Sequence, residues 1–363
     1  MKNIPLYQQI YNYFYERIKT GVLKKNDQIP TEKELMEMFL VSRITAKNAI
    51  NKLQEDGYVT RIPGKGTFVN AEINVNNDVL PKKKLIGLVL CDIDYTFGIE
   101  MLTSIETELA NKGYHMIFKR THESKESELQ ALKDLIALGV EGIIIQTVHG
   151  EIYRDEVLRI YLSGFPIVFI DRHMDKTSVP VITTNNKAAS KTMTERLLAA
   201  GYKNIAFISA DPKGTSSLEK RYEGFKEAYM KNDFSVLDLE TPTTRFKTKE
   251  NITSDLNKIK TLLTEHPEID CIFAAEMFVA QLSKRALKQL DLKVPHDVGI
   301  VTFDTDTLSS RHAYFTHIKQ NQVEMGREAV EILTKSITSR ETQANKKVYI
   351  DADIFVGKTT REI

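Results

Sequence analysis

Residues 31–69 read TEKELMEMFLVSRITAKNAINKLQEDGYVTRIPGKGTFV, and this stretch decides the fold of the first part of the chain. Thr31 and Glu34 form a capping box, in which each side chain accepts a hydrogen bond from the other residue's amide. A helix is therefore expected to begin here. Leu35 and Met38 are expected to face inward from it, because they lie three residues apart on one helical face.

A second helix is expected to begin after Ser42, which is a favoured capping residue. The apolar face of this helix carries Ala46, Ala49, Ile50 and Leu53, and the opposite face presents Arg43, Ile44, Thr45, Lys47 and Asn48. Arg43 and Lys47 are four residues apart, so both cations can enter one groove of a DNA duplex. The helix start at Ser42 also favours a phosphate group. The alternative is that these charges form only a solvated face.

The flanking segments complete the pattern. A further helix is expected over residues 6–20, with Gly21 as its C-cap and an apolar face at Leu6, Ile10, Phe14 and Ile18. Residues 58–62 and 67–69 are expected to pair as a hairpin with a glycine-rich tip. Three short helices and a hairpin predict a winged helix-turn-helix, with the third helix in the major groove and the hairpin as the wing.

The charge distribution agrees with a polyanion-binding head. Residues 1–70 hold 11 lysines and arginines against 7 acidic residues, whereas the remainder holds 39 against 42. A basic segment attached to a mildly acidic body is typical of a nucleic-acid-binding module joined to another domain.

This head resembles the GntR family. The resemblance rests on five motifs in the family's order and spacing: PLY at 5–7, PTE at 30–32, VSR at 41–43, GYV at 57–59 and GKGTFV at 64–69. It implies that DNA is contacted by Thr31, Lys33, Ser42, Arg43, Thr45 and Lys47, and that Lys65 and Gly66 enter the minor groove from the wing. Lys33 and Lys47 stand where the family usually has arginine, and lysine cannot make the bidentate fork, so base discrimination is expected to be softer there.

The length of 363 residues indicates more than one domain, because single cores stop growing near about 250–300 residues. We expect a DNA-binding domain over 1–70, a linker over 71–84 and an effector-binding domain over 85–363. The three lysines that end the linker are solvated or touch DNA. No secretory signal or membrane-length apolar run is visible, so a cytoplasmic protein is expected. Cys91 and Cys271 are expected to be buried free thiols, although one disulfide is arithmetically allowed.

The body alternates short apolar runs with amphipathic stretches. The runs lie at 85–91, 115–119, 142–146, 166–171, 205–209, 271–275 and 298–303, and the stretches include 100–112, 126–138, 187–200, 218–231, 250–265 and 278–290. This alternation predicts an α/β fold with parallel sheets. Ligands of such sheets bind at the carboxyl ends of the strands, so the residues that follow each run are candidate binding residues.

Those residues are polar and aromatic: Asp92, Asp94, Tyr95, Phe97, Gln146, Thr147, His149, Asp171, Arg172, Ser209, Asp211, Glu276, Asp304, Thr305 and Asp306. Nucleotide, metal and hydrolase motifs are absent, so neither a cofactor nor an enzyme is expected. Carboxylates, guanidinium groups and aromatic faces suit a neutral polyhydroxylated ligand. Phe97 is either a stacking platform or a core residue, and Glu276 either an acceptor or a helix-start anion. His149 is a contact or an ordinary loop residue.

The body resembles LacI/GalR-type sensor domains and periplasmic sugar-binding proteins. The motifs are KLIGLV at 84–89, PIVFIDR at 166–172, RYEGF at 221–225, VPHDVGIVTFD at 294–304 and IKQ at 318–320. The resemblance implies a two-lobed sensor and adds Arg221 and Gln320 to the candidate effector contacts. A GntR-type head on this body resembles the arabinose-operon repressor group. Glu276 and Met277 stand where the family commonly has Asn-Asp, so arabinose does not follow as the ligand.

Together these features predict a homodimeric repressor that binds double-stranded operator DNA and is released by a carbohydrate effector. An effector that acts as a co-repressor is an alternative. A transport-type sugar-binding protein, a GntR protein with a pyridoxal phosphate enzyme domain and one with a small helical sensor are further alternatives. The DNA-binding head disfavours the transport protein, the chain length disfavours the enzyme domain, and the repeated strands disfavour the small helical sensor.

Overall fold

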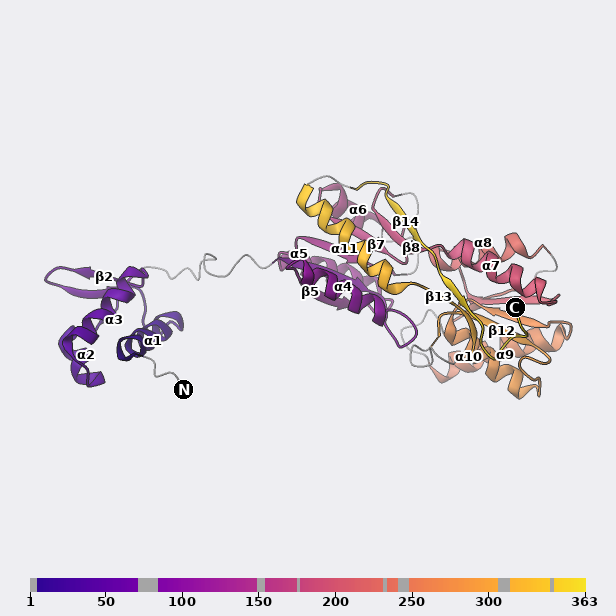
Figure 1. Ribbon diagram of the computed structural model, residues 1–363, viewed down its shortest axis with the longest axis horizontal. Helices are drawn as coiled ribbons and strands as arrows, with labels where there is room; N and C mark the ends of the chain where they lie inside the picture. The colour runs from indigo at the N-terminus through magenta and orange to yellow at the C-terminus, as the bar shows by residue number, and fades with distance from the viewer. Residues whose placement is uncertain are drawn as a thin grey trace. The chain divides into compact units, whose positions relative to one another are not determined.

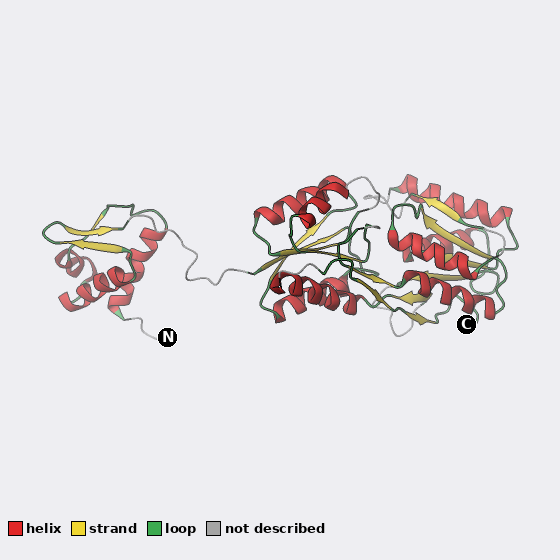
Figure 2. Ribbon diagram, turned by 90° about the horizontal axis from the view of Figure 1, so that it is seen from above, coloured by secondary structure: helices red, strands yellow, loops and turns green. Residues whose placement is uncertain are grey.

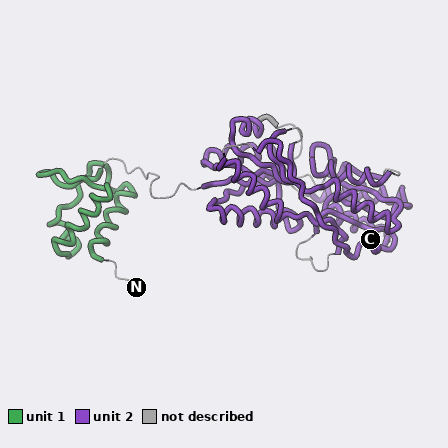
Figure 3. The backbone as a smooth tube through the Cα atoms, turned by 45° about the horizontal axis from the view of Figure 1, so that its top comes forward, with its two compact units in different colours: residues 1–82 green, residues 83–363 purple. Residues whose placement is uncertain are grey.

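The computed structural model describes residues 5–70, 84–148, 154–174, 177–230, 234–240, 248–305, 314–339 and 343–363. The chain forms two compact units, residues 1–82 and 83–363 (Figure 3). The predicted linker at 71–84 falls almost entirely outside the described residues, so its extent stays a prediction.

The first unit consists of α1 (Leu6–Lys19), β1 (Gln28–Ile29), α2 (Glu32–Phe39), α3 (Arg43–Glu55), β2 (Val59–Ile62) and β3 (Gly66–Val69). Its small sheet has the order β1-β3-β2, with both pairings antiparallel. Three helices and a β2–β3 hairpin confirm the predicted winged helix-turn-helix (Figure 2).

The core of this unit follows the predicted faces with two exceptions. Ile10, Phe14 and Ile18 of α1 and all four predicted apolar residues of α3 are buried. Met38, however, is 54% exposed, because Met36 and Phe39 pack against the core beside Leu35 instead. The prediction for Met38 is therefore wrong. Leu6 is also 54% exposed, since it begins α1 one turn before the buried stripe.

The second unit contains two lobes, each built on a six-stranded sheet. The N-lobe sheet has the order β14-β8-β7-β6-β4-β5, and the C-lobe sheet has the order β10-β9-β11-β12-β13-β15. The strands are β4 (Leu85–Leu90), β5 (His115–Arg120), β6 (Gly142–Ile145), β7 (Ile167–Ile170), β8 (Val181–Thr184), β9 (Ile205–Ala210), β10 (Val236–Leu239), β11 (Cys271–Ala274), β12 (Gly299–Phe303), β13 (Thr316–Lys319), β14 (Lys347–Ile350) and β15 (Asp353–Phe355). The pairings are parallel except β13 with β15, which confirms the predicted α/β class.

Helices cover both faces of each sheet (Figure 2). They are α4 (Ile99–Asn111), α5 (Lys125–Ala137), α6 (Arg154–Leu162), α7 (Asn186–Ala199), α8 (Ser216–Ala228), α9 (Lys249–Glu265), α10 (Met277–Gln289) and α11 (Gln322–Ser339). Strands such as β6, β7 and β9 are buried along their whole length, which is why they read as continuous apolar runs in the sequence. Cys91 and Cys271 are free and buried, as expected.

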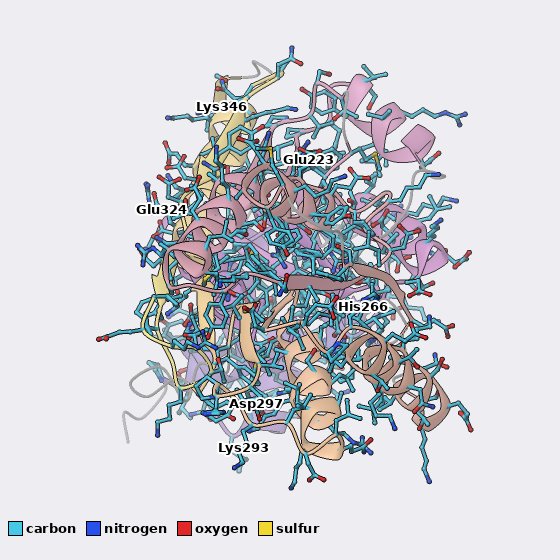
Figure 4. The ribbon with its side chains drawn as sticks, turned by 90° about the vertical axis from the view of Figure 1, so that its right-hand side faces the viewer. Glu223, His266, Lys293, Asp297, Glu324 and Lys346 are labelled. Carbon is cyan, nitrogen blue, oxygen red and sulfur yellow. The ribbon has the colours of Figure 1, made fainter. Side chains whose placement is uncertain are left out.

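The chain passes between the lobes at 184–186, 319–322 and 350–353 (Figure 1). The loop between α10 and β12 is held by local hydrogen bonds, such as that from the Lys293 amide to Asp297 Oδ2 at 2.7 Å. Both residues are labelled in Figure 4. Within the described ranges, no helix combines the length and apolarity required to span a lipid bilayer.

Candidate functional site

The two helix starts predicted in the first unit are formed as expected. Thr31 Oγ1 accepts a hydrogen bond from the Glu34 amide at 3.3 Å, and Glu34 Oε2 accepts one from the Thr31 amide at 2.7 Å. Ser42 Oγ accepts from the Thr45 amide at 3.2 Å and contacts Thr45 Oγ1 at 2.9 Å. The Thr45 hydroxyl is therefore engaged within the cap, and Thr45 is only half-exposed.

The cations of this unit are available to a polyanion. Lys33, Lys47 and Lys65 are exposed. Arg43 is 79% exposed, and its Nε lies 3.3 Å from Glu32 Oε2 on α2. An exposed pair of this kind contributes little, so Arg43 can exchange Glu32 for a nucleic acid at small cost.

Arg61 is a cation that the sequence analysis did not select. It lies on β2, and its NH2 contacts the other oxygen of Glu32 at 3.1 Å. Glu32 thus bridges Arg43 on the third helix and Arg61 in the hairpin. The signal available in the sequence was a basic residue in the strand that leads into the wing.

The tip of the wing requires glycine. Gly66 has a φ of +130°, and a Cβ at this position would collide with the Gln28 side chain. Gln28 Nε2 donates to the Lys65 carbonyl at 3.3 Å, which ties the wing to β1. The exposed Lys65 side chain is held at the tip by this turn.

The second unit contains a cavity of about 750 Å³ between its two lobes. The carboxyl ends of strands from both sheets form its walls, as expected for parallel sheets. The lining includes eight of the nine candidate effector residues: Tyr95, Phe97, Asp171, Arg172, Arg221, Glu276, Asp304 and Gln320. The ninth, His149, and also Asp306 lie outside the described residues. The remaining candidates, Thr147, Ser209, Asp211 and Thr305, are not part of the described lining, and Ser209 lies within β9 rather than after it.

Arg172 is anchored by a carboxylate in the N-lobe wall. Its NH1 lies 2.7 Å from Glu123 Oε1, and the two side chains are 15% and 11% exposed. Burial is the largest single effect and opposes the charge on Arg172, but Glu123, together with Cys91, Asp171 and Glu276, outweighs it, so the pKa of the arginine is raised. Arg172 is therefore a fixed cation with an acceptor already in place.

Asp171 is held by a buried network at the end of β7. Gln146 Nε2 donates to Asp171 Oδ2 at 2.7 Å, and Gln146 Oε1 accepts from the Cys91 amide at 3.1 Å. The other carboxylate oxygen, Asp171 Oδ1, is buried and has no hydrogen-bond partner. Asp171 also has a φ of 60°, an uncommon backbone conformation for a non-glycine residue that is often found at functional sites.

Arg221 forms the C-lobe side of the wall. Its Nε donates to Asn186 Oδ1 and its NH1 to the Ala275 carbonyl, both at 2.8 Å. The guanidinium carbon lies 3.9 Å from the centre of the Phe303 ring. Burial lowers the pKa of Arg221, and the carboxylate of Asp304 opposes that shift.

Asp304 and Gln320 form a second buried pair. The Gln320 amide donates to Asp304 Oδ1 at 3.2 Å, and Gln320 Nε2 donates to Oδ2. Gln320 Oε1 in turn accepts from Thr184 Oγ1 at 2.7 Å. Burial raises the pKa of Asp304 to about 6, although Arg221 and the bonds from Gln320 act in the other direction.

The aromatic candidates differ in exposure. Tyr95 is 68% exposed at the rim, whereas Phe97 also packs against the N-lobe core, so it contributes to both the core and the cavity. The loop that carries them is fixed by Asp94 Oδ1, which accepts from the Thr96 amide at 2.7 Å.

Several lining residues were missed by the sequence analysis. They are Cys91, Thr96, His122, Glu123, Ser217, Met277, Phe278, Gln281 and Phe303. His122 and Glu123 come shortly after the end of β5 at Arg120, so the strand-end rule that selected the other loops would have found them. Phe278 and Gln281 lie on α10, where only the folded arrangement reveals which helical face meets the cavity.

The cavity can bind a small polar molecule of the size typical of ligand sites, about 300–1,000 Å³. It offers many oxygen acceptors, two fixed guanidinium groups and aromatic side chains. Among the described residues, no group of three or more histidine, cysteine or acidic side chains is arranged to hold a metal ion.

Comparisons with known proteins cover both units. Residues 83–358 match the family described as periplasmic binding proteins and sugar binding domain of LacI family, and residues 6–69 match bacterial regulatory proteins of the gntR family. The chain is 27% identical, over 100% of its length and 99% of the relative's, to the arabinose metabolism transcriptional repressor of Geobacillus stearothermophilus. It is 30% identical to the ribose operon repressor of Halalkalibacterium halodurans, covering 76% of this chain and 80% of the relative.

A solved structure of similar fold is the periplasmic binding protein/LacI transcriptional regulator of Alkaliphilus metalliredigens, complexed with D-xylulofuranose. The TM-score is 0.63 at 23% identity, over 77% of this chain and 100% of that one.

Proposed function

Because the chain belongs to the family of periplasmic binding proteins and LacI sugar-binding domains and carries a GntR-type head, we propose that it is a homodimeric repressor of carbohydrate-utilisation genes, released from operator DNA by a sugar-type effector. It is a transcriptional regulator, as its full-length relatives are. Its site of action is then the bacterial chromosome in the cytoplasm, and its activity is binding rather than catalysis.

The observation that carries the proposal is the cavity wall shared by the two lobes. Asp171 and Arg172 come from the N-lobe, and Arg221 and Asp304 from the C-lobe. A ligand that bridges these groups favours the arrangement in which both lobes contact it. That differential affinity is the only means by which a ligand shifts a conformational equilibrium.

DNA recognition is assigned to the exposed face of α3 and to the wing. In this proposal Arg43 and Lys47 contact base edges, whereas Thr31, Lys33, Ser42, Thr45, Lys65 and Gly66 contact the backbone or the minor groove. Two heads in a dimer would read two half-sites about one or a few helical turns apart. An effector that changes the spacing of the heads then changes operator affinity, with a typical coupling of about 1–3 kcal/mol.

The experiment is a titration of labelled DNA from the chain's own promoter, followed by fluorescence anisotropy with and without pentoses and hexoses at constant salt. A sugar that weakens DNA binding about 5- to 150-fold supports the proposal. A sugar that strengthens binding indicates a co-repressor, and binding of sugar with no change in DNA affinity would contradict regulation by this cavity.

A further inference from the structure

Ile44 is an exposed apolar side chain in the first turn of α3. It is 72% exposed and lies outside the hydrophobic core of the first unit as the structure describes it. Helix α3 packs against α1 and α2 (Figure 1), and its buried face consists of Ala46, Ala49, Ile50 and Leu53. Packing within the first unit therefore does not explain an isoleucine at position 44.

The side chains beside Ile44 are already committed within the chain. Arg43 Nε lies 3.3 Å from Glu32 Oε2. Ser42 Oγ and Thr45 Oγ1 lie 2.9 Å apart in the cap of the helix. In the part of the chain that the structure describes, Ile44 is thus the side chain of this turn that serves neither the cap, nor an ion pair, nor the core.

An isoleucine on a helix is stiff, because the two substituents on its Cβ leave one strongly preferred χ1 rotamer. It presents a fixed apolar surface, and little conformational freedom is lost when a partner covers that surface. Isoleucine is also a poorer helix former than lysine, arginine or glutamine. Local helix stability therefore does not explain Ile44 either, whereas contact with a partner does.

The major groove of DNA offers one apolar group to such a side chain, the C5 methyl of thymine. The other groups on the base edges are hydrogen-bond donors or acceptors, and covering them with isoleucine removes their water without replacing it. Ile44 shares the exposed side of α3 with Lys47 and Asn48. A base pair that lies against this turn is therefore favoured when it presents a thymine methyl.

We infer that Ile44 is a specificity-determining residue of the DNA-binding head, and that it packs against the C5 methyl of one thymine in each operator half-site. This inference rests on the proposed function, in which Arg43 and Lys47 contact neighbouring base edges, and it adds an apolar contact to those polar ones. It requires thymine itself on the strand that Ile44 faces, because an A·T pair in the opposite orientation places the methyl elsewhere in the groove.

The test replaces thymines by uracil in DNA from the chain's own promoter, one position at a time and in both half-sites together. Uracil lacks only the C5 methyl, so the hydrogen-bonding edge of the base pair is unchanged. Fluorescence anisotropy at constant salt measures the affinity of the full chain for each duplex. At one thymine position, uracil should weaken binding about 4-fold per half-site, the effect of exposing about one buried methyl-sized group.

In Ile44→Ala, the ratio of thymine to uracil affinity at that position should fall to about one, because the apolar partner is gone. Val22→Ala is the matched control, since Val22 is 61% exposed in the same unit but lies outside its helices and strands. This control should keep the wild-type uracil profile. Both variants should keep the wild-type urea midpoint, because both side chains are exposed.

A uracil profile in which no position weakens binding overturns the inference, even if a sugar still releases the DNA and so leaves the proposed function intact. A uracil effect that persists in Ile44→Ala also overturns it, because another residue then contacts the methyl. Conversely, a uracil effect that Ile44→Ala abolishes supports the inference, and it does so even if no sugar alters DNA affinity, a result that contradicts the proposed function alone. Failure to bind any promoter fragment contradicts both.

Discussion

Replacing Arg172 by methionine tests how the cavity wall is stabilised. The ion pair with Glu123 has an N–O distance of 2.7 Å, and both side chains are almost buried. Removing one partner of a buried pair typically costs about 3–5 kcal/mol, because the remaining charge stays desolvated. Since both side chains keep a small exposed fraction beside the cavity, we expect a loss of about 2–3 kcal/mol in the free energy of unfolding.

The double variant Arg172→Met with Glu123→Gln removes the stranded charge and should recover at least about 1 kcal/mol of that loss. The assay is urea unfolding of the full chain, followed by far-UV circular dichroism. The urea midpoint of the larger unit is compared between variants whose transitions have the same denaturant slope m. The matched control is the exposed pair of Arg327 and Glu324 on α11, whose removal should cost at most about 1 kcal/mol; Glu324 is labelled in Figure 4.

Two results would refute this account. One is that Arg172→Met costs no more than Arg327→Met. The other is that the double variant loses as much free energy of unfolding as Arg172→Met and Glu123→Gln lose when their separate effects are added. Additive losses would mean that the two charges do not interact. In either case the cavity wall would be held by its apolar packing rather than by the ion pair.

Three further predictions concern other parts of the chain. Arg43→Ala should weaken operator binding by about 1–3 kcal/mol and relax one base position in an anisotropy assay; Lys293→Ala, exposed in the other unit, should leave binding unchanged. Gly224→Ala should destabilise the C-lobe by about 1–3 kcal/mol or more in urea unfolding, because the new Cβ would collide with the Lys187 carbonyl; an unchanged midpoint would contradict this contact. Burial raises the pKa of Asp304 from 3.8 to about 6, so the folded chain takes up this proton first and the group favours folding as the pH falls from about 6 to about 4. This contribution is at most about 3 kcal/mol. In Asp304→Asn, the free energy of unfolding should no longer increase by this amount as the pH falls through that range.

The sequence predicted those features that depend on local pattern. The capping box at Thr31 and the buried face of α3 are set by residues within one or two helical turns, and both are observed. The apolar runs predicted the strands β4, β5, β6, β7, β9, β11 and β12. Strands β8, β10, β13, β14 and β15 were not predicted, because each has only three or four residues and includes polar side chains, as in VITT, VLDL, THIK, KVYI and DIF.

Contacts between distant residues could not be predicted in the same way. Met38 was expected in the core, but the packing of α2 on its neighbours turned Met36 and Phe39 inward instead. The pair of Arg172 and Glu123 joins residues 49 positions apart, and no local pattern links them. The strand-end rule finds the candidates for such a site, whereas their partners depend on the three-dimensional arrangement of the loops.

The candidate site and the connections between the lobes share one residue, Gln320. Gln320 lies in a segment where the chain leaves the C-lobe sheet for α11 in the N-lobe, and its side chain accepts from Thr184, which lies at another such passage. Asp304 binds the same Gln320 through both carboxylate oxygens. A ligand hydroxyl that engages Asp304 therefore competes with or reorients the bonds that join two of the inter-lobe connections. Binding in the cavity acts directly on the segments about which the lobes can move, so no long relay through the core is needed for a sugar to alter the arrangement of the two lobes.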